Sequence, residues 1–133
     1  MASKSDYFEN IVLNLAFNDP AFTEATLYMA LCTVIPTDAS TGTSITEANY
    51  TGYARLIINA ADMSAAASGS KTNGLALTFA ACTAGASTII GFALVDAATL
   101  GNIHYWGTTT SKVIDVNNTP PTIAVSGLTV TED

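Results

Sequence analysis

Short apolar segments recur along most of this sequence, separated by clusters of turn-forming residues. After Pro20 they appear about every ten residues, bounded by Gly, Asn, Ser, Thr or Pro, a spacing typical of antiparallel β-sandwiches and jelly rolls. The sequence therefore predicts a mainly β domain with a small helical addition. The expected strands lie at 27–35, 53–58, 75–81, 87–95, 103–108 and 122–131, the last range holding one or two, and 60–73 has room for a further short strand.

Local composition predicts one buried strand and three connections. Residues 27–35 are nearly continuously apolar, which predicts a strand covered on both faces. Residues 38–49 form a long polar loop, and residues 96–102 have the length and composition of a hairpin loop. Asn73-Gly74 is a tight-turn dipeptide.

The N-terminal segment follows a helical period instead. Ser3 or Ser5 can cap the start of the helix, and Asn-Asp-Pro at 18–20 ends it. We expect a helix within residues 1–19, packed on the sandwich as a lid or clasp, and a single domain over residues 1–133. One stripe of this helix is apolar, formed by Phe8, Ile11, Val12, Leu15 and Ala16.

Charged side chains are scarce, and this scarcity limits the functions that the protein can have. They make up 11% of the 133 residues, with one histidine, four basic and eleven acidic residues, against about 25% in ordinary soluble domains. Acid–base catalysis and metal capture need several ionisable groups brought together. We therefore expect a protein that binds and assembles, neither an enzyme nor the holder of a cofactor or metal. The net charge of −7 argues against a nucleic-acid partner.

Residues 72–95 carry no charge and are long enough to span a bilayer. A turn-like cluster at 82–88 divides this segment, and no cationic anchors flank it. The segment is interpreted as two β-strands, and no membrane partner is expected.

The residues that could serve catalysis or metal binding also have structural explanations. His104 lies in a strand-like stretch with Asp96 across the expected hairpin, which is typical of a packed or surface imidazole. Residues 115–118 (Asp-Val-Asn-Asn) can offer oxygen ligands to calcium but are better explained as a polar loop. Cys32 and Cys82 lack metal-ligand spacing and are expected to be buried and to pack as small apolar residues. A disulfide between them is the alternative if their strands are neighbours.

Arg55 and four aromatic residues are the candidate contact residues. Arg55 lies in an apolar strand, so its burial requires a carboxylate such as Asp96 or Asp115, or one from a neighbouring subunit. Strand alternation places Tyr105 and Trp106 on opposite faces. Aromatic rings and arginine dominate contact hot spots, and packing in the core is the alternative for each ring. The possible interface comprises Tyr50, Tyr53, Arg55 and Trp106.

An ordered series of short motifs follows the expected helix. The motifs are Leu-Tyr-x-Ala-Leu at 27–31, Pro-Thr-Asp-Ala at 36–39, Gly-Tyr-Ala-Arg at 52–55, Gly-Phe-x-x-x-Asp-Ala at 91–97, Gly-Asn at 101–102, Trp-Gly at 106–107 and Gly-Leu-Thr-Val-Thr at 127–131. In this order they resemble a family of small tailed-bacteriophage structural proteins, often called tail fibre proteins. Similar small β-sandwich proteins serve as capsid decoration (cement) proteins and as neck or collar components.

The resemblance implies a virion structural protein assembled in the cytoplasm of the bacterial host. The leading hypothesis is a capsid decoration protein that bridges capsid subunits as a homotrimer. Its partners are then copies of itself and the major capsid protein or other virion proteins. The alternative is a tail fibre, neck or collar, or host-recognition module that uses the 38–49 loop and exposed aromatic residues.

Overall fold

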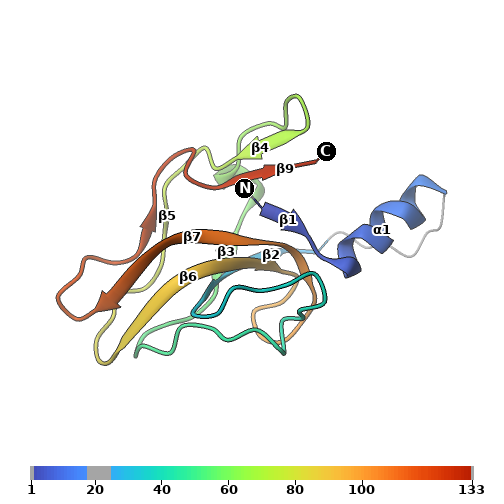
Figure 1. The fold of residues 1–133 in the computed structure, drawn as a ribbon. Coiled ribbons are helices and arrows are strands. Elements are labelled where there is room, and N and C mark those ends of the chain that lie inside the picture. The colour runs from blue at the N-terminus through green and yellow to red at the C-terminus, as the bar shows by residue number, and fades with distance from the viewer. Residues whose placement is uncertain (1, 18–24, 133) are drawn as a thin grey trace.

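The computed structural model describes residues 2–17 and 25–132, which form a β-rich body and one projecting α-helix (Figure 1). The elements in chain order are β1 (Ala2–Lys4), α1 (Asp6–Ala16), β2 (Leu27–Cys32), β3 (Leu56–Ile58), the short 3-10 helix η1 (Ala60–Asp62), β4 (Ser70–Thr72), β5 (Leu77–Thr78), β6 (Ala86–Val95), β7 (Ile103–Asp115), β8 (Thr122–Ile123) and β9 (Thr129–Thr131).

Seven strands form one sheet in the order β3-β2-β6-β7-β1-β9-β4, and β5 pairs with β8 in a second sheet. The mainly β fold with one N-terminal helix is confirmed. Paired strands are antiparallel except β1 and β9, which run parallel with Ala2 opposite Val130. A parallel pair needs a long connection between its strands. Here nearly the whole chain forms that connection, because β1 and β9 are the first and last strands in the sequence.

The β6–β7 hairpin forms the middle of the large sheet, with Phe92 opposite Gly107. The Asp96 carboxylate closes its loop by accepting hydrogen bonds from the Asn102 backbone N–H (2.7 Å) and from Asn102 Nδ2 (3.1 Å). Gly101, with a φ of +80°, takes the left-handed conformation there. The predicted hairpin loop at 96–102 is confirmed.

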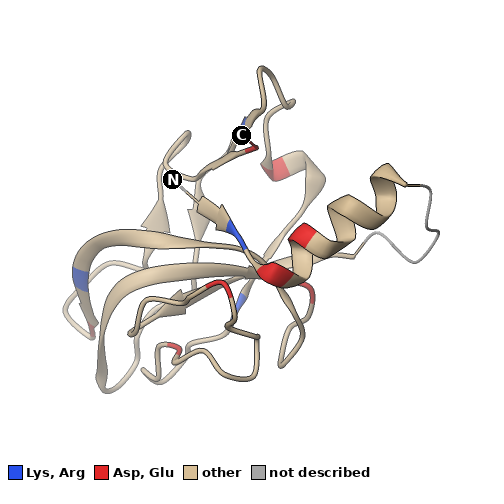
Figure 2. Ribbon diagram, turned by 45° about the vertical axis from the view of Figure 1, so that its right-hand side comes forward, with Lys and Arg blue, Asp and Glu red and all other residues tan. Residues whose placement is uncertain are grey.

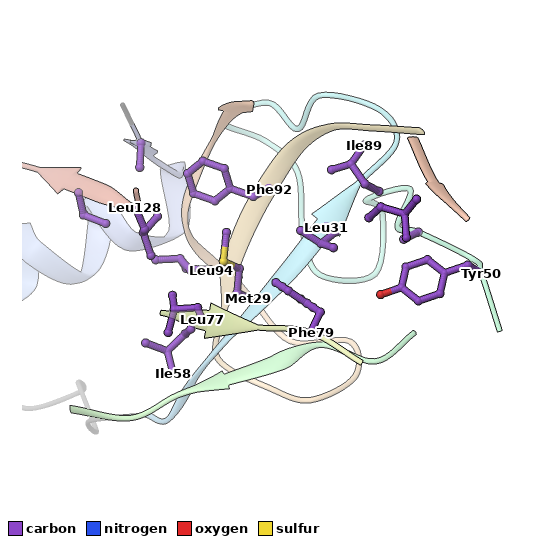
Figure 3. Close-up of a cluster of buried hydrophobic side chains, with 14 of the residues drawn as sticks. Met29, Leu31, Tyr50, Ile58, Leu77, Phe79, Ile89, Phe92, Leu94 and Leu128 are labelled. Carbon is purple, nitrogen blue, oxygen red and sulfur yellow. The ribbon is translucent and has the colours of Figure 1, made fainter. Parts of the chain in front are cut away.

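β2 at 29–32 and the second half of β6, at 91–95, are covered on both faces, and for β2 this agrees with the prediction from its apolar run. One face contributes to the main core, where β2 and β6 side chains meet Leu77 and Phe79 from the β5 segment (Figure 3). The opposite face is lined with small side chains, so the 38–49 loop packs closely against it through Ile45. This second cluster comprises Ala30, Cys32, Ala93, Val95 and Ile103.

Several strand boundaries differ from the expected ones. β2 ends at Cys32 because the Thr33 N–H turns away to donate to the Thr46 carbonyl at 2.9 Å. Residues 53–55 are not strand, since the Tyr53 N–H closes a turn onto the Tyr50 carbonyl at 3.1 Å. β7 runs past residue 108 to Asp115, because its polar but largely β-branched residues pair with β6 while their side chains face solvent.

The helix α1 differs most from expectation, because none of its residues is buried. Ser5 is its N-cap and accepts a hydrogen bond from the Phe8 N–H at 3.3 Å. The Ser5 N–H in turn donates to the His104 carbonyl at 3.0 Å, and the Asp6 N–H to the Asp38 carbonyl at 3.2 Å. These bonds attach only the start of the helix, and the rest extends away from the body (Figures 1 and 2). Residues 18–20, the expected helix stop, lie outside the described residues.

Residues 72–95 run through the end of β4, β5 and β6, as the interpretation of two strands requires. Within residues 2–17 and 25–132, no helix is both long and apolar enough to cross a membrane.

Candidate functional site

The guanidinium of Arg55 joins two loops to the segment before β3, and only 4% of this side chain is exposed. Its Nη1 donates to the carbonyls of Ala97 (2.8 Å) and Leu100 (2.7 Å) in the β6–β7 loop. Its Nη2 donates to the Gly42 carbonyl in the 38–49 loop at 2.8 Å. Arginine suits this position because its planar fork donates in several fixed directions at once.

The carboxylate partner of Arg55 is Glu47, with Nη2 2.7 Å from Oε1. The prediction that buried Arg55 requires a carboxylate is confirmed, but the expected partners, Asp96 or Asp115, are wrong. Asp96 is held in the hairpin loop. Asp115 Oδ1 caps a turn by accepting from the Asn117 N–H and from Asn118 Nδ2, both at 2.8 Å.

The hydrogen bonds that Asp115 accepts show that the polar segment 115–118 is a turn. In the part of the chain that the structure describes, no three His, Cys, Asp or Glu side chains form a group that would hold a metal ion.

Tyr50 and Tyr53 pack inside the body. The Tyr53 hydroxyl donates to Glu47 Oε2 at 2.6 Å and accepts from the Leu31 N–H at 3.1 Å. Burial, reinforced by Glu47, raises the pKa of Tyr53. Tyr50 is 3% exposed and donates to the Ala80 carbonyl at 3.0 Å. Both rings serve the core of a single copy, and their place in an interface stays a prediction.

Tyr105 and Trp106 project to opposite faces, as alternation predicted. Tyr105 packs on the main core and donates to Glu132, which also pairs with Lys4 at 2.7 Å. Trp106 packs on the second cluster and donates through Nε1 to Asp38 Oδ1 at 3.2 Å. Trp106 is only half-buried, so part of it remains accessible as an interface candidate.

At Gly42 the 38–49 loop lies directly against the hairpin loop, and the Gly42 N–H donates to the Gly101 carbonyl at 3.0 Å. A Cβ there would lie 2.0 Å from the Leu100 carbonyl oxygen and 2.8 Å from Val95 Cγ1. We expect Gly42→Ala to lower the free energy of unfolding in urea by about 2–3 kcal/mol, because one of the two backbones must shift. Gly74→Ala is the control, since its Cβ would find its nearest neighbour at 3.6 Å. Equal losses in the two variants would contradict this account of the loop.

His104 forms the platform on which α1 begins. It is 4% exposed, and its ring stacks on Phe8 with centroids 4.7 Å apart, while the Tyr7 ring lies at 5.8 Å. Its Nε2 lies 3.8 Å from Asp96 Oδ2. The interpretation of His104 as a packed imidazole is confirmed.

Burial lowers the pKa of His104 below its ordinary value of 6.5, although Asp96 acts in the opposite direction. The unfolded chain therefore takes up a proton at this residue at a higher pH than the folded chain. Stability conferred by the neutral imidazole is lost as the pH falls below about 6.5. We expect His104→Gln to show a flatter decline of unfolding free energy between pH 7 and pH 5, measured in urea at fixed ionic strength. An unchanged slope would contradict this.

Both cysteines are buried and free, as their interpretation as small apolar residues predicted. Burial raises the pKa of the Cys32 thiol to about 12, with Glu47 adding to the effect. The thiol therefore stays protonated and unreactive at neutral pH.

Asn73 is a structural residue that the sequence analysis missed. It is fully buried, and its Nδ2 donates to the carbonyls of Leu75 and Ala124, each at 2.8 Å. Its Oδ1 accepts from the Leu128 N–H at 2.8 Å. The Asn-Gly dipeptide correctly marked a sharp change of direction but not the side chain's partners, two of which, Ala124 and Leu128, lie in a distant part of the sequence.

Comparison with known families identifies the class of this chain. The family model described as podophage GP4 fiber I protein gp80 matches residues 3–131. The chain belongs to this podophage fibre family. Membership confirms the predicted resemblance to phage structural proteins and makes the chain a virion structural component. No curated protein matches the chain.

In this podophage fibre family member, the charged groups of the body are largely engaged within it. Arg55 pairs with Glu47, Lys4 pairs with Glu132, and Asp96 and Asp115 hold turns. The end of α1 is different, because Leu13 and Phe17 are 57% and 85% exposed. The projecting helix and its C-cap therefore present exposed apolar side chains at their end.

Proposed function

We propose that this chain is a structural subunit of a phage fibre, and that it acts by contact with other virion proteins and not by catalysis. The match of the podophage fibre family over residues 3–131 carries the proposal. The buried ion pair of Arg55 and the packing of His104 under α1 support it, because both give structural roles to groups that could otherwise serve chemistry.

The shape of the body supports a contact role. The 38–49 loop, expected as a contact surface in the fibre alternative, is tied to the β6–β7 hairpin loop through Arg55. Fixing a loop before binding reduces the entropy that binding costs. The loop and the half-buried Trp106 beside it therefore offer a rigid surface to a partner.

Capsid decoration by a bridging homotrimer is the competing placement. A body poor in long charged side chains loses little side-chain entropy when it binds a shell, which supports this role as well. The fibre description of the matching family puts the fibre placement first.

Counting copies in purified particles separates the two placements. Quantitative mass spectrometry of washed virions gives the ratio of this chain to the major capsid protein. The fibre proposal predicts a handful to dozens of copies per particle, retained in a fraction enriched in detached fibres. Hundreds of copies that stay with emptied shells would overturn it in favour of decoration.

A further inference from the structure

The outer face of α1, formed by Glu9, Val12 and Leu13 and continued by the C-cap residue Phe17, has no cover within the described chain. Three of these residues are exposed apolar side chains, with exposed fractions of 37% for Val12, 57% for Leu13 and 85% for Phe17. The positions follow the i, i+3, i+4, i+8 spacing of one helical face. An isolated helix shorter than about 12–15 residues is marginal in water, and α1 has 11. A partner that covers this face would stabilise the helix.

The body contains a groove beside β4 with a volume of about 490 Å³. Its lining is mixed: Leu27, Ile58 and Met63 contribute apolar surface, and Asn59 and Lys71 contribute polar groups. No residue of α1 lines it. Because hydrogen bonds from Ser5 and Asp6 hold the start of α1 at β7 and the neighbouring loop, the helix of the same copy is directed away from the body (Figure 1).

The charges of the two surfaces are complementary. The helix carries Asp6 and Glu9 and no basic residue (Figure 2). Neither acid forms an ion pair with the residues that the structure describes. On the same basis Lys71 has no ion-pair partner. Asp62 accepts two hydrogen bonds from Asn59, at 2.8 and 3.0 Å, and forms no ion pair with Lys71.

We propose that the outer face of α1 of one copy binds in the groove beside Lys71 of a second copy. Leu13 and Phe17 pack on the apolar side chains of the groove, Leu27, Ile58 and Met63, and Glu9 lies near Lys71. The contact joins two different surfaces, so each added copy leaves one helix and one groove free, and copies assemble into a closed ring or an open row. The contact is a property of the purified chain, and its absence would leave the fibre proposal standing.

The test is sedimentation equilibrium of the full purified chain over micromolar to submillimolar concentrations. We expect the average mass to rise with concentration. Leu13→Asp should weaken the association by roughly tenfold or more, while the control Val125→Asp should not, although Val125 is also 57% exposed. Circular dichroism checks that each variant keeps its fold. A wild-type chain that stays monomeric throughout would overturn the proposal.

Charge reversal tests the pairing of helix with groove. Glu9→Lys and Lys71→Glu should each weaken self-association, and Lys112→Glu should not. A mixture of the Glu9→Lys and Lys71→Glu chains should associate again, because every helix then meets a groove of opposite charge. If Lys71→Glu associates like the wild type, the helix binds another surface, such as a second helix, and the proposal is wrong.

Discussion

Replacing Arg55 with methionine is expected to lower the free energy of unfolding by about 3–5 kcal/mol, the usual cost of removing one partner from a buried ion pair. The loss is large because domains of this size have only about 5–15 kcal/mol of stability. Methionine fills much of the side-chain volume but leaves Glu47 without its cation and the carbonyls of Gly42, Ala97 and Leu100 without their donor. Urea unfolding followed by tryptophan fluorescence measures the change, since Trp106 lies beside the 38–49 loop.

Two further variants make the Arg55 result specific. Lys112→Met removes a cation with no ion-pair partner among the described residues and should change stability by no more than about 0.5 kcal/mol. Glu47→Gln combined with Arg55→Met should cost less than the sum of the two single variants, because neither charge is then buried alone. A loss below about 1 kcal/mol for Arg55→Met would show that the ion pair does not hold the loops.

Asn73→Ala is expected to cost about 3–4 kcal/mol or more. The change leaves the Leu128 N–H and the carbonyls of Leu75 and Ala124 without their side-chain partner, and each buried unsatisfied group costs about 1–3 kcal/mol. Asn73 lies between β4 and β5, and its partners in the other segment lie between β8 and β9. Its loss therefore loosens the point where the chain passes from the large sheet to the small one.

A nearly isosteric variant separates hydrogen bonding from packing at this site. Asn73→Asp keeps the shape but replaces the donor that faces two carbonyls, so it should destabilise about as much as Asn73→Ala. The surface control Asn118→Ala removes hydrogen bonds within an exposed turn and should cost less than about 1 kcal/mol. If Asn73→Asp were as stable as the wild type in chemical unfolding, the role assigned to its Nδ2 would be wrong.

The fold class and the central hairpin were predictable because their signals are local. The apolar run of β2 and the β-branched residues of β6 indicated strands, and a polar loop between β6 and β7 indicated their pairing. Alternation also placed Tyr105 and Trp106 correctly on opposite faces. These inferences depend only on the two-residue period of a strand.

The candidate site was less predictable because its contacts join distant segments. Sequence spacing indicated that Arg55 needs a carboxylate but not which one, since the choice depends on how the 38–49 loop folds over the small residues of β2 and β6. The position of α1 was missed for a similar reason. The predicted stripe is partly buried only at Phe8 and Ile11, and it is exposed beyond them because the helix extends away from the body. A helical period shows which residues share a face but not whether that face lies on the chain's own sheet.

The most direct test of the account is the location of this chain on the phage particle. Antibodies raised against the purified chain and labelled with gold should mark the fibres of intact virions in electron micrographs. After a treatment that detaches the fibres, the remaining particles should carry no label, and the released fibres should carry it. Label spread evenly over the capsid surface, or absent from the particle, would contradict the assignment to a fibre.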